Sequence, residues 1–224
     1  MAAVFVGKRI AGDFYDSIRV SPQRVLIGLL DVAGRRQDNR GILNAAQKIF
    51  RESGPELLAA EDVNEADAMT ELTLRINRGL LEIASGVLSC PSFLACYHEQ
   101  FGTLCYTNAG HTPALVRDTA GITQLESTGL PLGLFSHATS DARIVGLEKG
   151  AALLLVSRGV VDCEGRNDGS MEEFGLERVK EAFQEDTKAT AQEVCASILS
   201  SVAAFSGEAP VCDDRTALVL LRRA

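Results

Sequence analysis

Two long stretches of the chain repeat apolar residues at helical spacing. From 64 to 85 the apolar positions fall three and four residues apart, and the same spacing returns from 190 to 205. This period places the apolar side chains on one face of an α-helix. Thr190 and Glu193 have the spacing of a capping box, which opens a helix. The pattern therefore predicts amphipathic helices at 64–85 and 190–205.

Two further helices are predicted from shorter patterns. Residues 37–52 carry apolar residues at helical spacing, and Ser53-Gly54-Pro55 is expected to end this helix. Ser170 and Glu173 have the spacing of a second capping box, which predicts a shorter helix running through Phe183.

Short apolar runs between these helices predict β-strands. Val25–Val32 is almost entirely apolar, which is typical of a strand buried on both faces. The other runs lie at 93–98, 103–108, 114–117, 122–125, 142–147, 151–157 and 216–222. Several are joined by short polar turns that contain glycine, which indicates hairpins. Because the helices come in pairs, the order predicts antiparallel sheets rather than a parallel one.

The predicted fold class is α+β, an α-β-β-α sandwich of two stacked antiparallel sheets flanked by helix pairs. The helices at 64–85 and 190–205 are expected on opposite outer faces of the sheets. No linker or repeat interrupts the pattern, so residues 1–224 are expected to form a single domain.

Composition and charge exclude several classes of protein. The 224 residues include 22 Lys and Arg against 30 Asp and Glu, a net charge of -8, which argues against nucleic acid or an anionic membrane as partner. No apolar run approaches the ~18 residues of a membrane span. The N-terminus lacks the layout of a secretion signal, so a cytoplasmic location is expected. The six cysteines form no CxxC pair, which favours buried, reduced thiols.

Acidic residues recur at the ends of the apolar runs. Asp13 and Asp16 lie in one such segment, Asp31 closes the run that begins at Val25, and Asp213 and Asp214 precede the last run. Carboxylates gathered at a sheet edge can bind Mg²⁺ or Mn²⁺. Aspartate at a strand end is also ordinary turn chemistry, and spacing alone leaves both interpretations open.

The order of short motifs along the chain resembles a known family. The motifs are Gly12-Asp13-Phe14-Tyr15-Asp16, Asp31-Val32-Ala33-Gly34, 106–113, 129–133, 153–162, Phe174-Gly175 and Asp213-Asp214-Arg215-Thr216. In this order they resemble the PPM-type (metal-dependent, type 2C) serine/threonine protein phosphatases. The resemblance is to the bacterial branch that contains stage II sporulation protein E and the regulators of sigma-B-type stress response. The family's opening strand is expected to be short or missing, as in a domain cut from a longer protein.

The resemblance implies a site with two divalent metals, Mn²⁺ or Mg²⁺, which activate a water for in-line attack on phosphorus. It implies that Asp31 bridges the metals, that the Val32 carbonyl contacts one of them, and that Asp13 and Asp213 are further ligands. His111 is expected to be a structural turn residue. The implied substrate is phosphoserine or phosphothreonine on a regulatory protein, such as an anti-sigma-factor antagonist. The oligomeric state is not predicted.

Two departures from the family pattern put that site in question. Ser157-Arg158-Gly159 stands where the family usually has Thr-Asp-Gly, so an arginine replaces a metal ligand. The repulsion between a guanidinium and a divalent ion is of the order of 4 kcal/mol, roughly a thousandfold in metal affinity. Arg35 and Arg36 follow Gly34 where the family tends to have Gly-His-Gly. With Arg158 they either contact phosphate or neutralise leftover carboxylates.

The sequence therefore predicts a PPM-type phosphatase acting on a phosphorylated regulatory protein. The alternative is a catalytically impaired pseudophosphatase that acts as a protein-binding module. A third interpretation, an unrelated metal-dependent hydrolase, requires the motif order to be a coincidence.

Overall fold

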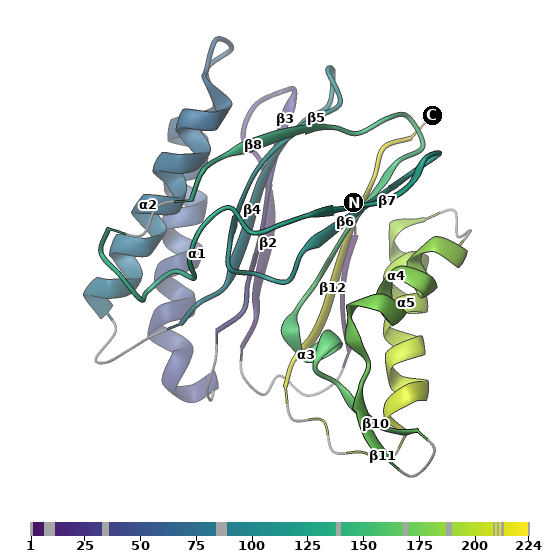
Figure 1. Ribbon diagram of the computed structural model, residues 1–224. Helices are drawn as coiled ribbons and strands as arrows, with labels where there is room; N and C mark the ends of the chain where they lie inside the picture. Colours follow the sequence, from purple (N-terminus) through teal and green to yellow (C-terminus); the bar gives the residue numbers. More distant parts are fainter. Residues whose placement is uncertain are drawn as a thin grey trace. The chain divides into compact units, whose positions relative to one another are not determined.

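Two five-stranded antiparallel sheets organise the chain in this computed structural model (Figure 1). The structure describes residues 2–6, 12–32, 36–83, 89–137, 140–167, 170–186, 190–207, 209, 211 and 213–223. The chain divides into two units. Residues 11–111 and 126–147 form one, here called the Asp31 unit, and residues 1–10, 112–125 and 148–224 form the other, the Asp213 unit.

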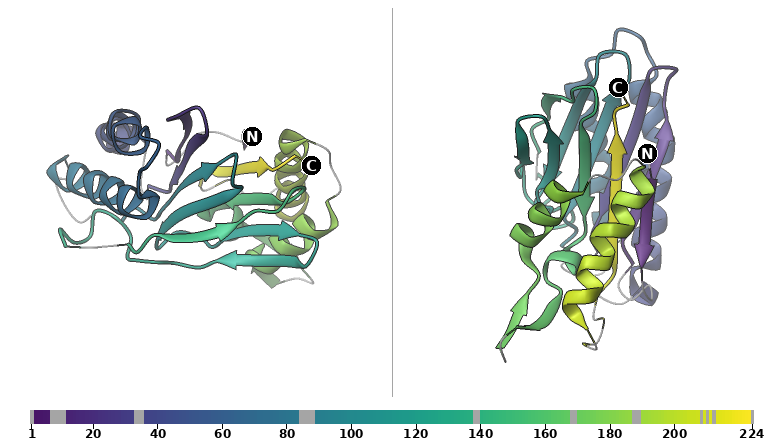
Figure 2. Two further views of the ribbon diagram at one scale, coloured as in Figure 1. Left: turned by 90° about the horizontal axis from the view of Figure 1, so that it is seen from above. Right: turned by 90° about the vertical axis from the view of Figure 1, so that its right-hand side faces the viewer.

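The Asp31 unit contains the sheet β2-β3-β4-β5-β8 and two helices. Its strands are β2 (Phe14–Arg19), β3 (Arg24–Leu30), β4 (Ser92–His98), β5 (Thr103–Ala109) and β8 (Arg143–Gly146), and its helices are α1 (Arg36–Leu58) and α2 (Glu65–Ile83). The two helices lie side by side (Figures 1 and 2), with α2 on β4 and β5 and α1 against β2. The apolar face predicted for 64–85 is the buried face of α2: Met69, Leu72, Ile76 and Leu80 are fully buried.

The Asp213 unit contains the sheet β1-β12-β9-β6-β7, three helices and a small hairpin. Its strands are β1 (Ala2–Val6), β6 (Ala114–Asp118), β7 (Gly121–Leu125), β9 (Ala152–Val156), β10 (Glu164–Asn167), β11 (Ser170–Glu173) and β12 (Arg215–Leu221), and its helices are α3 (Arg158–Val161), α4 (Gly175–Glu185) and α5 (Ala191–Ser206). Helix α5 packs on β12 and β1 and buries Val194, Ile198 and Val202.

These elements confirm the α+β class with antiparallel sheets and most of the predicted helices and strands. The capping box that opens α5 is present in both directions: Glu193 N–H donates to Thr190 Oγ1 at 3.2 Å, and Thr190 N–H donates to Glu193 Oε2 at 3.1 Å. No described helix is long and apolar enough to cross a membrane.

The predicted capping box at Ser170 and Glu173 is wrong. Ser170–Glu173 is strand β11, which pairs antiparallel with β10, and the helix begins only at Gly175. The Phe174 N–H donates to the Cys163 carbonyl at 2.7 Å. The backbone hydrogen bonds of Ser170–Glu173 are thus made by pairing with β10 rather than by the first turn of a helix.

The predicted end of the first helix is also wrong, because α1 continues through Ser53-Gly54-Pro55 to Leu58. Pro55 removes one backbone donor from the helix, a cost of about 3 kcal/mol in an exposed helix. Here the last turn is held by packing: Leu58 is fully buried, and Gly54 lies so close to the Leu26 side chain that a Cβ there would collide with it. Tertiary contacts therefore extend the helix beyond its breaker residues.

Two further features differ from the expectations. The opening strand, expected to be short or missing, is present as the five-residue strand β1, which pairs with β12 from Ala2↔Val219 to Val6↔Arg215. The runs at 142–147 and 151–157 are not hairpin partners: β8 pairs with β5, whereas β9 pairs with β12 and β6. The five residues 147–151 thus connect strands of different sheets, which the pattern of apolar residues does not reveal.

Candidate active site

Asp13 and Asp31 stand at the same end of the sheet in the Asp31 unit. Strand β2 begins at Phe14, β3 ends at Leu30, and these two residues are register partners. Asp13 and Asp31 are the next residues outward on each side. An antiparallel ladder places such opposite residues about 5 Å apart at their Cα atoms. The register, rather than the sequence spacing, brings the two carboxylates together.

The buried thiol of Cys90 lies close enough to both carboxylates for their charges to affect its pKa. The pKa of Cys90 is raised to about 12, mainly by burial and to a smaller extent by the charges of Asp31 and Asp13, against a hydrogen bond with Ser92 that lowers it. Both aspartates therefore lie within electrostatic reach of one side chain. Cys90 remains a neutral thiol beside them, so it adds no negative charge to this end of the sheet.

The backbone around Asp31 is fixed by hydrogen bonds. Asp31 is 2% exposed, and its N–H donates to the Pro91 carbonyl at 2.9 Å. The carbonyl of Val32, also buried, accepts a bond from Asn39 Nδ2 at 3.3 Å. A carbonyl oxygen has two lone pairs, so this bond leaves Val32 with acceptor capacity.

Asp213 lies in the Asp213 unit, and both of its carboxylate oxygens are engaged. Oδ2 accepts a bond from Arg158 Nη2 at 3.2 Å, and Oδ1 accepts one from the Asp214 N–H at 2.8 Å. The same guanidinium lies beside a second carboxylate, with Arg158 Nε 3.7 Å from Asp162 Oδ2. Arg158 thus balances part of the negative charge of two aspartates.

The segment around Arg158 is built to meet the strand that follows Asp213. The hydroxyl of Ser157, fully buried, donates to the Asp214 carbonyl at 3.0 Å and accepts the Thr216 N–H at 3.0 Å. A Cβ at Gly159 would collide with the Asp214 carbonyl, so only glycine permits this approach. The Ser-Arg-Gly motif therefore holds the short helix α3 against the Asp213–Asp214 turn.

The predicted ligands differ in how well they suit a divalent cation. Asp13, Asp31 and the Val32 carbonyl offer the hard oxygen donors that Mg²⁺ and Mn²⁺ prefer, and they fit such an ion. Asp213 does not fit, because its two oxygens already bind a guanidinium and a backbone N–H. Among the described residues, no three His, Cys, Asp or Glu side chains form a ready-made metal site.

The other predicted site residues have varied outcomes. Arg35 lies outside the described residues, and for Arg36 only the backbone, at the start of α1, is described. His111 is buried, and its N–H donates to Asn108 Oδ1 at 2.8 Å, a turn geometry in agreement with the predicted structural role. The structure adds Asp162 to this group: it lies four residues after Arg158, the spacing at which helical side chains meet, and that spacing is the signal in the sequence that points to it.

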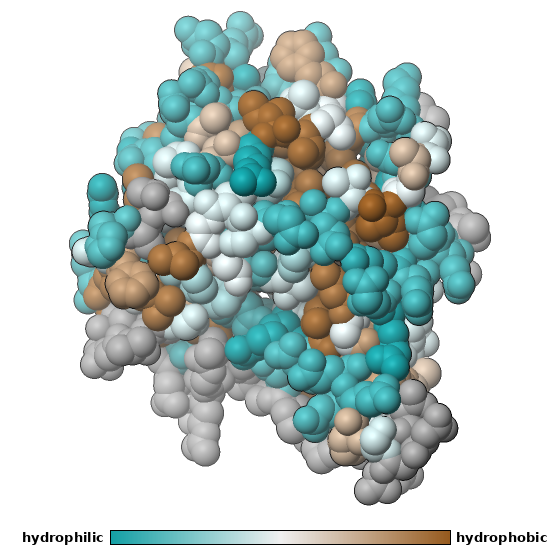
Figure 3. Space-filling model, in the orientation of Figure 1, coloured by the Kyte–Doolittle hydropathy of each residue, from teal (hydrophilic) through white to brown (hydrophobic). Residues whose placement is uncertain are grey.

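Asn108 organises the segment that follows β7. Its carbonyl accepts the backbone N–H groups of Thr128 and Gly129 at 2.7 and 3.1 Å, and Leu132 exchanges two backbone bonds with Cys90. This segment therefore runs along the end of the sheet where Cys90 lies. The apolar side chains of Leu130 and Phe135 in this segment are exposed. On the face of the molecule drawn in Figure 3, apolar patches in brown lie among polar residues in teal.

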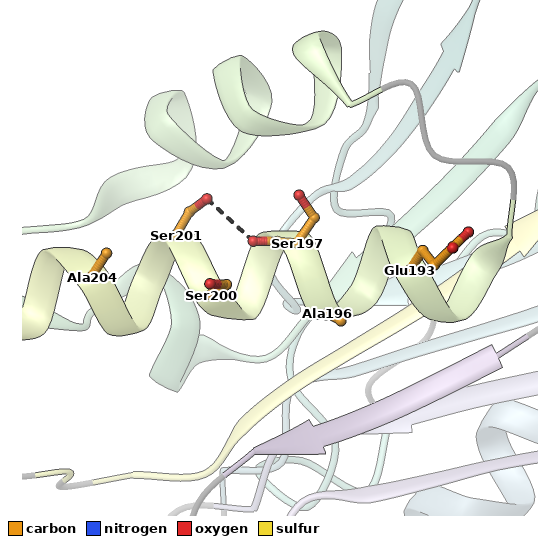
Figure 4. Close-up of a pocket in the computed structure, with 6 residues that line it drawn as sticks. All are labelled: Glu193, Ala196, Ser197, Ser200, Ser201 and Ala204. Atoms are coloured by element: carbon orange, nitrogen blue, oxygen red, sulfur yellow. Dashed lines mark hydrogen bonds between the residues drawn. The ribbon is translucent and has the colours of Figure 1, made fainter.

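An open hollow on α5 offers little chemistry. It is lined by Glu193, Ala196, Ser197, Ser200, Ser201 and Ala204, all on this one helix (Figure 4). Its side chains are small apart from Glu193, and the Ser201 hydroxyl donates to the Ser197 carbonyl at 3.2 Å. The candidate active site therefore rests on the strand-end aspartates.

The fold is the one seen in PP2C-type phosphatase domains. Two solved structures share the fold: the RsbU and RsbW domains of Rv1364c from Mycobacterium tuberculosis (TM-score 0.80, 20% identity, 100% of this chain and 61% of that one) and the SiaA-PP2C domain of Pseudomonas aeruginosa (TM-score 0.79, 18% identity, 98% and 85%). The family model described as Stage II sporulation protein E (SpoIIE) matches residues 21–223, and the chain belongs to this family.

Among named relatives, phosphoserine phosphatase RsbU of Bacillus subtilis (strain 168) is 26% identical over 218 residues, 96% of this chain. The chain spans only 61% of the length of RsbU. A structure of RsbX in complex with magnesium also shares the fold, with a TM-score of 0.66, 12% identity, and coverage of 97% of this chain and 92% of that one.

Proposed function

We propose that this chain is a metal-dependent phosphatase that removes phosphate from phosphoserine or phosphothreonine on a regulatory protein. Family membership supports the reaction class, and the position of Asp13 and Asp31 directly beyond the register pair Phe14↔Leu30 supports a metal-assisted route. The relatives named as phosphatases favour catalysis over a binding module without activity.

In this proposal the Asp31 unit holds the cation. Asp13 and Asp31 supply carboxylate oxygens, and Val32 supplies its carbonyl. When bound, the ion supplies a nucleophile at neutral pH and charge neutralisation for the phosphoryl group. The burial of Asp31 and its backbone bond to Pro91 keep this ligand in place without the ion, so little ordering entropy is lost on binding. Both Mn²⁺ and Mg²⁺ take this donor set.

The arginines take different roles in the proposal. Arg158 is engaged by Asp162 and Asp213, which supports the neutralising role over phosphate contact. Arg35 and Arg36, directly after the Asp31 motif, are the proposed phosphate contacts because guanidinium forks match phosphate oxygens.

The proposed substrate is a phosphorylated protein of a signalling or stress-response pathway, of the anti-sigma-factor antagonist type. The acidic balance of the chain supports a protein partner over nucleic acid or an anionic membrane surface. We assign residues 1–224 as one phosphatase domain, working in the cytoplasm.

The test is phosphate release from a phosphoserine peptide and from p-nitrophenyl phosphate in Mn²⁺, compared with the same protein in EDTA. We expect measurable Mn²⁺-dependent hydrolysis that Asp31→Asn lowers about a hundredfold or more. Asp141→Asn, which changes an exposed carboxylate of the same unit, is the matched control and should be unaffected. Hydrolysis that is indifferent to both EDTA and Asp31→Asn would reject the proposal.

A further inference from the structure

Arg158 lies beside two carboxylates of the Asp213 unit, those of Asp213 and Asp162. Its Nη2 lies 3.2 Å from Asp213 Oδ2, and its Nε lies 3.7 Å from Asp162 Oδ2. The remaining Asp213 oxygen accepts the Asp214 N–H. One guanidinium and one backbone N–H thus give this carboxylate the positive charge and the contacts to its oxygens that a bound cation would give it.

The position of Arg158 follows from the backbone around it. Ser157 bonds the strand end to Asp214 and Thr216, and Gly159 lets α3 approach the Asp214 carbonyl closely. The base of the Arg158 side chain is therefore fixed next to the Asp213 turn. The Arg158 side chain is 44% exposed and the Asp213 side chain 24% exposed, so solvent weakens their attraction.

We infer that Arg158 replaces a divalent cation at Asp213. The chain then binds one divalent ion, at Asp13 and Asp31, instead of the two that the family resemblance implies. The inference rests on the proposed function, since that function gives Asp13 and Asp31 their metal. A divalent ion on Asp213 has to displace the guanidinium or bind beside it. Partial exposure screens the repulsion, so we expect the loss of affinity to be about tenfold or more rather than the thousandfold expected without screening.

The experiment measures Mn²⁺ bound per chain, by equilibrium dialysis and by the loss of the free-Mn²⁺ electron paramagnetic resonance signal, without any substrate. Wild type is compared with Arg158→Asp and Arg158→Ala. Arg19→Asp is the matched control: Arg19 forms an exposed ion pair with Glu99 at 2.8 Å, and the change alters net charge equally. A thermal melt of each variant checks that it is folded.

We expect Arg158→Asp to bind one additional Mn²⁺ per chain. In the wild type the affinity of this additional site for Mn²⁺ should be at least tenfold lower, and Arg19→Asp should bind Mn²⁺ as the wild type does. Arg158→Ala should lie between, because it removes the cation without adding a ligand. Wild type already binding the second ion at the affinity of Arg158→Asp overturns the inference. The inference is also overturned if Arg158→Asp folds and binds no more Mn²⁺ than the wild type. If Arg158→Asp does not fold, the same result with folded Arg158→Ala overturns it.

The readout separates this inference from the proposed function. If the chain hydrolyses no phosphoester but Arg158→Asp gains an ion, the proposed function fails and the inference stands. If Mn²⁺-dependent hydrolysis is robust and the ion count of the variants is unchanged, the proposed function stands and the inference fails.

Discussion

Replacing Asp31 by asparagine should stabilise the metal-free protein while removing its response to metal. Asp31 is buried, and Asp13 stands opposite it at the end of the β2–β3 ladder. Side chains on facing ladder positions place their charges about 5–8 Å apart, and at an effective dielectric of about 20 two like charges at this separation repel by about 2–3 kcal/mol. Because Asp13 is only half-buried, screening reduces this to about 1–2 kcal/mol. The asparagine side chain keeps the shape and one acceptor oxygen, so the repulsion is lost with little change in packing.

The assay is thermal unfolding in EDTA and in Mn²⁺. In EDTA we expect Asp31→Asn to unfold above wild type, by roughly 2–4 °C for each kcal/mol at this chain length. In Mn²⁺ at a hundred times its Kd, wild type should gain about 2.7 kcal/mol and Asp31→Asn almost nothing. The control Asp141→Asn should follow wild type in both conditions. An Asp31→Asn protein that is less stable than wild type in EDTA, or that keeps the full Mn²⁺ shift, refutes the reasoning.

Three further outcomes follow from the packing. Ser157→Ala removes two buried hydrogen bonds and should cost about 2–4 kcal/mol in urea unfolding, whereas Ser200→Ala, on the exposed side of α5, should cost under about 0.5 kcal/mol. The Cys90 thiol, with a pKa raised to about 12, should resist a thiol reagent at pH 8 until the protein unfolds. Its contribution to stability should be complete below about pH 9 and decline as the pH approaches 12; rapid labelling of native Cys90 would contradict this. Asn77→Ala removes two bonds, to Gly133 N–H at 2.8 Å and the Phe135 carbonyl at 2.9 Å, and should speed proteolysis of that segment; unchanged cleavage would count against the anchoring role.

Local signals predicted the structure well where the bonds they describe are also local. The capping box of Thr190 and Glu193 forms within four residues, and no distant segment competes with it. The same spacing at Ser170 and Glu173 failed, because a strand from 164 to 167 pairs with that segment. A capping motif indicates the structure that a segment favours in isolation. Pairing with another strand can replace that local helix start at a small cost in free energy.

The candidate site shows the same division. The sequence identified the acidic and arginine motifs, and it predicted that Arg158 would weaken metal binding, because residue type fixes charge and donor chemistry. That Phe14 pairs with Leu30, and so sets Asp13 opposite Asp31, was decided by strand register. That Arg158 bonds Asp213, 55 residues away, was decided by the packing of α3 against β12. The chemistry of each group is a property of one residue, whereas its neighbours depend on contacts between distant segments, which only the folded chain brings together.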